Sequence, residues 1–259
     1  MTEIIMLKLG GSLITDKNKP YTARHDTIRR IAKEIHEAIN EKDFKLIVGH
    51  GGGSFPHQSA TRYGTQKGMC GMDSKKGIAL VQNDAAKLNR IVVDALIEEG
   101  INAISIQPSS GAISEGSRIK TWDTKPLEKY LELGIIPVPY GDVGLDSKQG
   151  CCILSTEEIL TFLAKRLGSK RIILAGKTDG VLTGDGELIK EITGKNIKDI
   201  KKHLKGSDAK DATGGMVHKV ERMLEFTIDG IGSEIINGNK PGYIRRALLG
   251  ETDIGTIIR

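Results

Sequence analysis

The stretch IIMLKLGGS at residues 4–12 decides the fold of this 259-residue chain. Five of its first six residues are apolar, which is typical of a strand buried on both faces, and the glycine pair then ends the strand. The arrangement returns at 45–53, where KLIV is followed by GHGGG. Between the two strands, apolar residues at helical spacing predict an amphipathic helix over 26–39, with Asp26 as its N-cap. A strand, a helix and a second strand in this order favour a parallel sheet.

Short apolar strands alternate with helices along the rest of the chain. This pattern predicts an α/β fold, an open αβα sandwich whose mainly parallel central sheet has helices on both faces. Residues 1–259 contain no Pro- or Ser-rich linker, so we expect a single domain with an N-terminal lobe at about 1–150 and a C-terminal lobe at about 151–259. Ser155 and Glu158 have the spacing of a capping box, and Gly168 ends the helix that they begin. The remaining expected elements are helices at 74–99, 124–133, 196–204, 214–228 and 241–249 and strands at 103–106, 135–138, 171–175, 234–236 and 256–258.

Composition excludes several classes of protein. Glycine is abundant, at 32 residues, but has no three-residue period, so the chain is not collagen-like. The net charge of +5 is too small, and aliphatic residues too plentiful, for wholesale disorder. Basic residues are interspersed with acidic ones and aromatics make up 4%, so we expect no nucleic-acid partner. Three cysteines form no disulfide framework or metal pair, and no signal peptide or membrane span is evident; we therefore expect a cytoplasmic protein without a membrane partner.

The excess glycine falls mostly where predicted strands end. Gly10 and Gly11 follow the first strand, residues 51–53 follow the second, and Gly141 and Gly176 follow later ones. In parallel α/β sheets, ligands bind beyond the carboxyl ends of the strands. Glycines at that edge allow backbone N–H groups to approach phosphate oxygens. The sequence therefore predicts an anion-binding edge.

Lys8 lies inside the first predicted strand, two residues before Gly10. A buried ammonium is costly without an anionic partner, so Lys8 is a candidate phosphate ligand. Lys17 follows the glycine pair closely enough to reach the same anion. The alternatives are an edge-strand lysine at position 8 that extends to water, and a solvated loop lysine at position 17.

The densest motif is HGGGSFPH at 50–57. Three glycines at a strand-to-helix turn suit a phosphate cradle, and His57 could then donate to a phosphoryl oxygen or transfer a proton. Pro56 has no N–H and cannot donate to a ligand. The alternative for His57 is a capping or solvent-facing histidine.

The segment DATGGMVHK at 211–219 enters a predicted helix, whose N-terminus can hold phosphate while Lys219 leans over it. An N-capped helix with a surface lysine is the alternative. A Walker A reading of Gly176-Lys177-Thr178 fails because Arg171 stands where that motif needs glycine. Two phosphate cradles, several lysines and a histidine at one edge indicate phosphoryl transfer, which needs positioning and charge neutralisation more than a nucleophile.

The motifs KLGGS at 8–12, HGGG at 50–53, GD at 141–142 and DATGGM at 211–216, in this order, resemble those of the amino acid kinase superfamily. The resemblance covers the whole chain and is greatest to the isopentenyl phosphate kinases, on HGGGSFPH, SIQPSS at 105–110 and DATGGM. It implies ATP-dependent phosphorylation of isopentenyl phosphate to isopentenyl diphosphate by direct in-line transfer, in an archaeal-type mevalonate route. It also implies Mg²⁺ and a homodimer.

The resemblance assigns roles to individual residues. The implied catalytic residues are Lys8, which bridges the donor and acceptor phosphates, with Lys17, His57, Glu157 and Lys219. The implied acceptor site consists of Gly11, Gly52, Gly53, His57, Ile78, Gln82 and Thr156. The implied ATP site consists of Lys8, Gly10, Ser12, Lys17, Lys177, Asp179, Gly214, Gly215 and Lys219, and no side chain is assigned to a metal.

Three positions depart from the pattern of the family. Pro56 stands where a glycine often precedes the histidine, and Thr156-Glu157 replace a Gly-Asp pair. Glu157 in place of that aspartate would orient Lys8 and Lys219 by ion pairing, and Thr156 would narrow the space beside the acceptor phosphate. Lys177 stands where the family has an acidic residue.

Two other functions are compatible with these motifs. A phosphonate or other small-monophosphate kinase of the fosfomycin-kinase type would carry the same histidine-bearing loop. A nucleotide-sensing or anion-binding module on the same fold would have no turnover, since fold does not imply function. The presence of Lys8, His57 and Lys219 together argues for catalysis.

Overall fold

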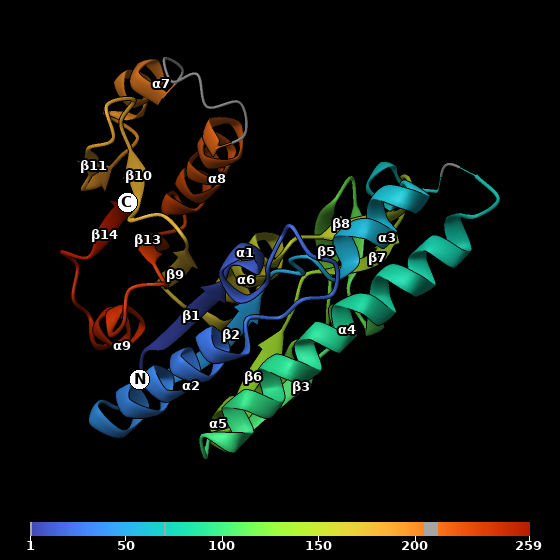
Figure 1. Cartoon of the computed structure of the whole chain (residues 1–259), viewed down its shortest axis with the longest axis horizontal. Coiled ribbons are helices and arrows are strands. Elements are labelled where there is room, and N and C mark those ends of the chain that lie inside the picture. The colour runs from blue at the N-terminus through green and yellow to red at the C-terminus, as the bar shows by residue number, and fades with distance from the viewer. Residues whose placement is uncertain (1, 70, 205–211) are drawn as a thin grey trace.

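A computed structural model describes residues 2–69, 71–204 and 212–259 (Figure 1). At its centre lies a six-stranded sheet with the order β12 (Glu191–Ile192), β14 (Gly255–Ile258), β13 (Gly232–Asn237), β9 (Arg171–Gly176), β1 (Ile4–Leu9) and β2 (Lys45–His50). The strands β13, β9, β1 and β2 run parallel, and β14 is antiparallel to β13. The prediction of a mainly parallel central sheet is confirmed.

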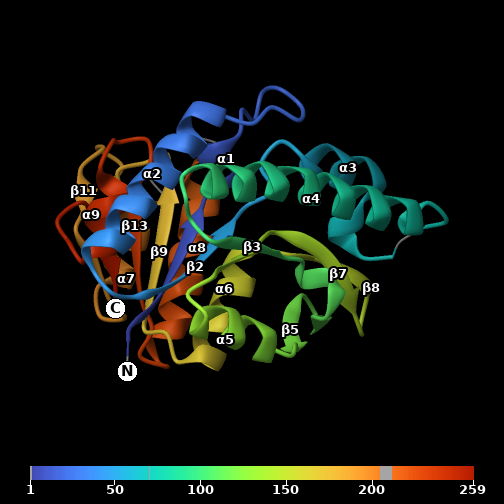
Figure 2. The same ribbon diagram turned by 90° about the horizontal axis from the view of Figure 1, so that it is seen from below.

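Two smaller sheets lie beyond β2 (Figure 2). In the first, β6 (Ile136–Pro139) pairs in parallel with β3 (Ala103–Ile106), and Tyr140 bridges to His50 at the end of β2. The second has the order β5 (Arg118–Thr121), β4 (Ile113–Glu115), β7 (Asp142–Asp146) and β8 (Gly150–Leu154). Sequence patterns missed this four-stranded sheet because its strands are only three to five residues long, too short for a clear period.

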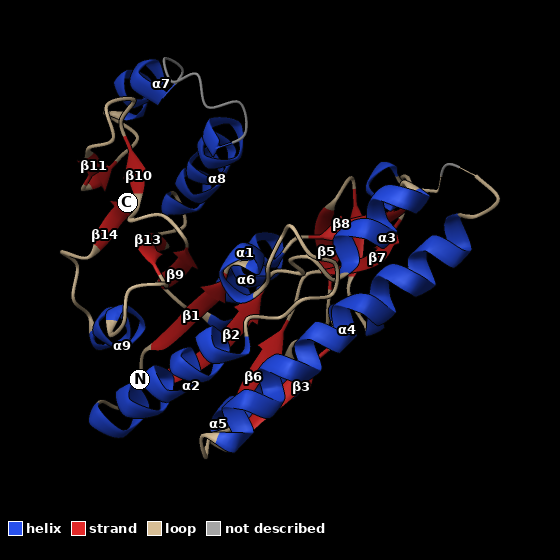
Figure 3. Ribbon diagram, viewed as in Figure 1, coloured by secondary structure: helices blue, strands red, loops and turns tan. Residues whose placement is uncertain are grey.

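Helices cover both faces of the central sheet (Figure 3). On one face, α2 (His25–Glu41), α4 (Ser74–Glu98) and α9 (Tyr243–Leu249) share an apolar cluster with Ile5 and Leu7 of β1. On the other face, α5 (Lys125–Glu132), α6 (Thr156–Leu167), α7 (Ile197–Leu204) and α8 (Ala212–Thr227) share a second cluster with Met6. Successive side chains of a strand point to opposite faces. Lys8 therefore lies on the same face as Met6, toward α6 and α8.

Shorter elements connect the main ones. α1 (Gly11–Ile14) follows β1, and α3 (Pro56–Tyr63) follows β2 and leads into a 3₁₀ turn, η1 (Thr65–Lys67). A second 3₁₀ turn, η2 (Pro108–Ser110), follows β3, and β10 (Val181–Leu182) pairs with β11 (Leu188–Ile189). In the described part of the chain, no helix is both long enough and apolar enough to cross a membrane.

Every strand and helix that the sequence predicted is present, with its ends within two residues of the expected positions. Two details of helix capping were wrong. α2 begins at His25 with Arg24 as N-cap, so Asp26 lies inside the first turn. Ser155 does cap α6 by accepting a hydrogen bond from the Glu158 N–H, but the Glu158 carboxylate bonds to other elements and completes no capping box.

Candidate active site

Two cavities open at the carboxyl end of the parallel strands, and Gly51, Gly53 and His57 border both of them. The first, here called the apolar cavity, has a volume of about 370 Å³, and the second, the lysine-lined cavity, about 590 Å³. Residues lining the apolar cavity include Gly52, Pro56, Ala60, Val81, Asp142, Ile153, Leu154, Thr156 and Glu157. Residues lining the lysine-lined cavity include Lys8, Gly10, Gly11, Ser12, Lys17, Lys177 and Lys219.

The glycine turns after β1 and β2 pack directly against each other. A Cβ on Gly11 would overlap the backbone of Gly53, and Gly53 itself has a φ of +56°, in the left-handed region. These two glycines are therefore required for the turns to fit together, a reason that the sequence prediction of a phosphate cradle did not include.

Some backbone N–H groups near these turns are already hydrogen-bonded within the protein, and others are free. The N–H of Gly10 donates to Ala175 O at 2.8 Å, and the N–H of Gly141 donates to His50 O, so neither is available to an anion. For Gly52 and Gly53, by contrast, the described residues provide no acceptor. The two N–H groups at the boundary of the cavities are thus free to bind an anion.

Lys8 is buried at the base of the lysine-lined cavity, with 8% of its surface exposed. Its ammonium forms an ion pair with the carboxylate of Glu157, in the first turn of α6. The pairing follows from the alternation along β1, which turns Lys8 toward α6. The predicted ion pair between Glu157 and Lys8 is present.

Glu157 also faces Lys219 of α8. Burial alone would raise the pKa of Glu157, but the charge and hydrogen bond of Lys8, together with the charge of Lys219, hold this pKa below its ordinary value. Burial, followed by the neighbouring ammonium of Lys8, lowers the pKa of Lys219. One carboxylate is thus shared by two lysines, which leaves excess positive charge for an anionic ligand.

Two further lysines line the same cavity from its outer side. Lys17 lies on the loop between α1 and α2, and Lys177 directly follows β9; both are exposed. Limited desolvation at the cavity wall, then the charge of Arg24, lowers the pKa of Lys177, and the charge of Lys17 lowers it further. An anion between these cations would relieve their mutual repulsion.

His57 and His50 have different environments, although one motif contains both. His57 lies in the first turn of α3, is exposed, and borders both cavities. His50 is fully buried, donates from Nδ1 to Gly51 O and accepts from Asn89, and burial lowers its pKa to about 4. His50 is therefore a neutral structural residue, and His57 is the histidine that a ligand can reach.

Thr156 is buried and lines the apolar cavity, and its predicted place beside the acceptor phosphate remains a prediction. Its hydroxyl donates to His50 O at 2.7 Å, so it also ties the start of α6 to the end of β2. Pro56 is the first residue of α3 and occupies the space that a Cβ on Gly52 would need. Both residues therefore shape the walls of the apolar cavity.

Three other predicted site residues are not among those that line the two cavities. From α4, Val81 lines the apolar cavity, whereas Ile78 packs beside Val81 and Gln82 bonds to Tyr140. Asp179 is bonded to Asn237 and Lys240. The acceptor and ATP contacts predicted for these three residues, Ile78, Gln82 and Asp179, remain predictions. Gly214 and Gly215 lie in the first turn of α8, at the helix end that the sequence predicted.

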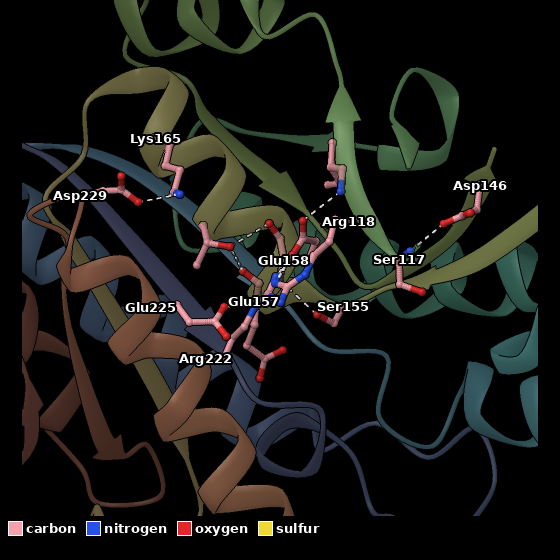
Figure 4. Close-up of polar contacts among 12 residues, drawn as sticks. Ser117, Arg118, Asp146, Ser155, Glu157, Glu158, Lys165, Arg222, Glu225 and Asp229 are labelled. Atoms are coloured by element: carbon pink, nitrogen blue, oxygen red, sulfur yellow. Dashed lines mark hydrogen bonds and ion pairs between the residues drawn. The ribbon is translucent and has the colours of Figure 1, made fainter. Parts of the chain in front are cut away.

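Sequence patterns missed a network around Glu158 (Figure 4). The Glu158 carboxylate accepts from the N–H of Ile119 in β5 at 2.9 Å, pairs with Arg118 at 3.4 Å, and pairs with Arg222 of α8. Arg222 lies three residues after Lys219, so the network ties the helix that carries Lys219 to α6 and β5. The partners are 39 to 64 residues from Glu158 in sequence, beyond the reach of any local pattern.

Asp142 was noted only as part of a glycine-containing motif. The structure buries its carboxylate at the wall of the apolar cavity, where it accepts from the N–H groups of Ser109 and Val143. Burial raises the pKa of Asp142 above its ordinary value. A buried carboxylate with two backbone donors fixes the turn η2 against the start of β7.

These features are typical of a phosphotransferase: a parallel sheet with glycine turns at its edge, a lysine-lined cavity, and an apolar cavity beside it. The sequence profile of the amino acid kinase family matches residues 3–237, so the chain belongs to the amino acid kinase family.

Several relatives of similar sequence and structure are isopentenyl phosphate kinases. The chain is 38% identical to the isopentenyl phosphate kinase of Methanocaldococcus jannaschii over 96% of each chain. It is 39% identical to that of Methanothermobacter thermautotrophicus over 98% of each chain. A crystal structure of an isopentenyl phosphate kinase superposes with a TM-score of 0.85, at 37% identity, covering 99% of this chain and all of that one. The product complex of the Thermoplasma acidophilum enzyme has a TM-score of 0.78 at 30% identity.

Proposed function

We propose that this chain is an ATP-dependent phosphotransferase that converts isopentenyl phosphate to isopentenyl diphosphate, with ADP as the second product. The observation that carries the proposal is the pair of cavities that meet at Gly51, Gly53 and His57, one lined by four lysines and the other largely apolar. Full-length relatives named isopentenyl phosphate kinases support the same acceptor. The product would supply an isoprenoid-forming route of the archaeal mevalonate type.

The donor phosphates belong in the lysine-lined cavity. Lys8 and Lys219 extend into it from β1 and α8, and Lys17 and Lys177 close its outer side. Cations fixed in a partly buried site stabilise the charge that spreads over a phosphoryl group in transfer. Glu157 is already ion-paired, and its role in this proposal is to hold Lys8 in place.

The acceptor belongs in the apolar cavity, with its phosphate at the shared border. The free N–H groups of Gly52 and Gly53 and the side chain of His57 supply donors for that phosphate. A phosphate monoester has a second pKa of about 6, so the attacking oxygen is already ionised near neutral pH and needs no protein base. Burying a five-carbon tail against Ala60, Val81 and Ile153 contributes roughly 4 kcal/mol at about 0.8 kcal/mol per carbon.

A divalent cation fits this arrangement as a partner of ATP. Among the described residues, no group of three or more His, Cys, Asp or Glu side chains is placed to hold a metal. Phosphate oxygens and water are suitable ligands for Mg²⁺, which we propose enters with the nucleotide and neutralises part of its charge. A homodimer, a cytoplasmic location and the division into an acceptor-binding lobe at about 1–150 and an ATP-binding lobe at about 151–259 remain predictions.

An acceptor panel with labelled ATP tests the proposal. Isopentenyl phosphate, dimethylallyl phosphate, fosfomycin, uridylate and acetylglutamate are compared by kcat/KM under identical conditions. We expect the highest value with isopentenyl phosphate. A preference for fosfomycin would establish the phosphonate-kinase alternative instead. ATP binding without turnover of any acceptor would indicate a nucleotide-sensing module.

A further inference from the structure

We infer that Asp84, a buried carboxylate outside both cavities, is a positioning residue that holds the segments bearing Lys17 and His57 in register. The inference rests on the proposed function, since it gives these two residues their roles at the donor and acceptor phosphates.

Asp84 lies on α4, with 3% of its surface exposed. Its Oδ2 accepts hydrogen bonds from the Tyr21 hydroxyl at 2.9 Å and from the Ser59 hydroxyl at 2.6 Å. Lys87, one turn further along α4, approaches Oδ1 at 3.2 Å from the solvent side. A buried carboxylate is costly unless donors satisfy it, and here two of its donors come from different segments of the site.

Tyr21 belongs to the loop that carries Lys17. It has a φ of +49°, a conformation that a bulky residue adopts rarely and only where its surroundings hold it. Its ring meets the edge of Phe55 with 5.8 Å between centroids, and the N–H of Thr22 donates to the Ser54 hydroxyl at 3.3 Å. The Lys17 loop therefore rests on the turn that enters α3, and the bond to Asp84 fixes its far end.

Ser59 belongs to α3, two residues after His57, and is buried. Within the described part of the chain, neither the Lys17 side chain nor the His57 side chain forms a hydrogen bond or an ion pair. Where each side chain points is therefore set by the segment that carries it. One carboxylate oxygen bonds both segments, so Asp84 sets the spacing between the two.

Two single-atom substitutions separate the two bonds. Ser59→Ala removes the bond to α3, and Tyr21→Phe removes the bond to the Lys17 loop. A lost hydrogen bond to a charged group corresponds to about a tenfold effect or more. We expect Ser59→Ala to raise KM for isopentenyl phosphate about tenfold and to leave ATP affinity within twofold. We expect Tyr21→Phe to weaken ATP binding, measured by calorimetry, about tenfold and to leave the acceptor KM within twofold.

Variants of Asp84 itself complete the series. Asp84→Ala should show both defects, and Asp84→Asn, which keeps a carbonyl acceptor, should recover part of each. Asn83→Ala, a matched control at the exposed position of α4 next to Asp84, should retain wild-type constants. Thermal unfolding of each variant is measured in parallel, because a purely structural residue would lower Tm without separating the two affinities.

The outcomes are distinguishable. If Ser59→Ala and Tyr21→Phe lower Tm but change neither the acceptor KM nor ATP affinity, Asp84 is structural only and the inference is wrong. The inference is also wrong if both variants change the acceptor KM and the ATP affinity by the same factors. If the wild-type protein fails to phosphorylate isopentenyl phosphate, the proposed function is wrong, while ATP calorimetry of Tyr21→Phe against Ser59→Ala still tests Asp84 without any acceptor.

Discussion

Replacing Lys8 with methionine removes its charge from the site while keeping an unbranched side chain in the same space. Lys8 is 8% exposed, so methionine suits its position, and the substitution leaves Glu157 without its principal partner. Two effects follow from this geometry. The first is on the rate, because a fixed cation beside the transferring phosphoryl group is lost. The second is on stability, because a partly buried carboxylate loses its counter-charge.

The magnitudes follow from the surroundings of the pair. Removing one fixed electrostatic stabiliser of a transition state costs about 2.7–4 kcal/mol, and we expect the lower end, about a hundredfold in kcat, because Lys219 remains close. Breaking a fully buried ion pair costs about 3–5 kcal/mol of stability. The Glu157 side chain retains 22% exposure, so we expect a smaller loss of about 2 kcal/mol, or roughly 4–8 °C in Tm.

A double variant separates the two effects. Lys8→Met combined with Glu157→Gln no longer contains an unpaired carboxylate, so its Tm should return toward that of the wild type while kcat stays low. Steady-state turnover with saturating ATP and isopentenyl phosphate gives kcat, and calorimetric unfolding gives Tm. A kcat within threefold of the wild type in Lys8→Met would refute the assigned role of Lys8. An unchanged Tm would refute the energetic importance of the pair.

Three further outcomes are expected. The folded-state pKa of Glu157 lies below the ordinary 4.5, so the ionised carboxylate stabilises the fold above pH 4.5, and this contribution is lost as the pH falls through the folded-state pKa. Urea unfolding at pH 7 and at pH 3 should therefore show a larger loss of unfolding free energy for the wild type than for Glu157→Gln. Gly53→Ala should destabilise the protein by more than about 2 kcal/mol, because a Cβ would overlap Thr15 and strain the backbone. Gly186→Ala, which is also at positive φ but faces open space, should cost only about 1 kcal/mol. Equal losses of unfolding free energy in chemical denaturation would contradict this reasoning. Arg222→Met should lower the unfolding free energy in urea by about 2 kcal/mol, because it breaks the buried ion pair with Glu158. Lys165→Met, which breaks the more exposed ion pair with Asp229, should cost less than about 1 kcal/mol. The reverse order would count against the network.

The order of strands and helices was predictable because each depends on local patterns. The apolar run at residues 4–9 and the helical spacing at 26–39 are legible over short windows, and both elements are present. The four-stranded sheet around β7 was not predictable, since its short strands pair only after the chain has folded back. Capping at Ser155 was predictable from a three-residue spacing, while the contacts of the Glu158 carboxylate were not.

By itself, the sequence determined the alternating elements, the glycine turns at the strand ends, and a lysine inside the first strand as a candidate ligand of an anion. The tertiary structure alone decided what satisfies that lysine, a glutamate 149 residues away. It also decided that Asp84 joins the Lys17 loop to α3, 63 and 25 residues distant from it. The physical reason is that periodicity and capping act between neighbours in the chain, whereas ion pairs, shared carboxylates and cavities depend on which faces the packed core brings together.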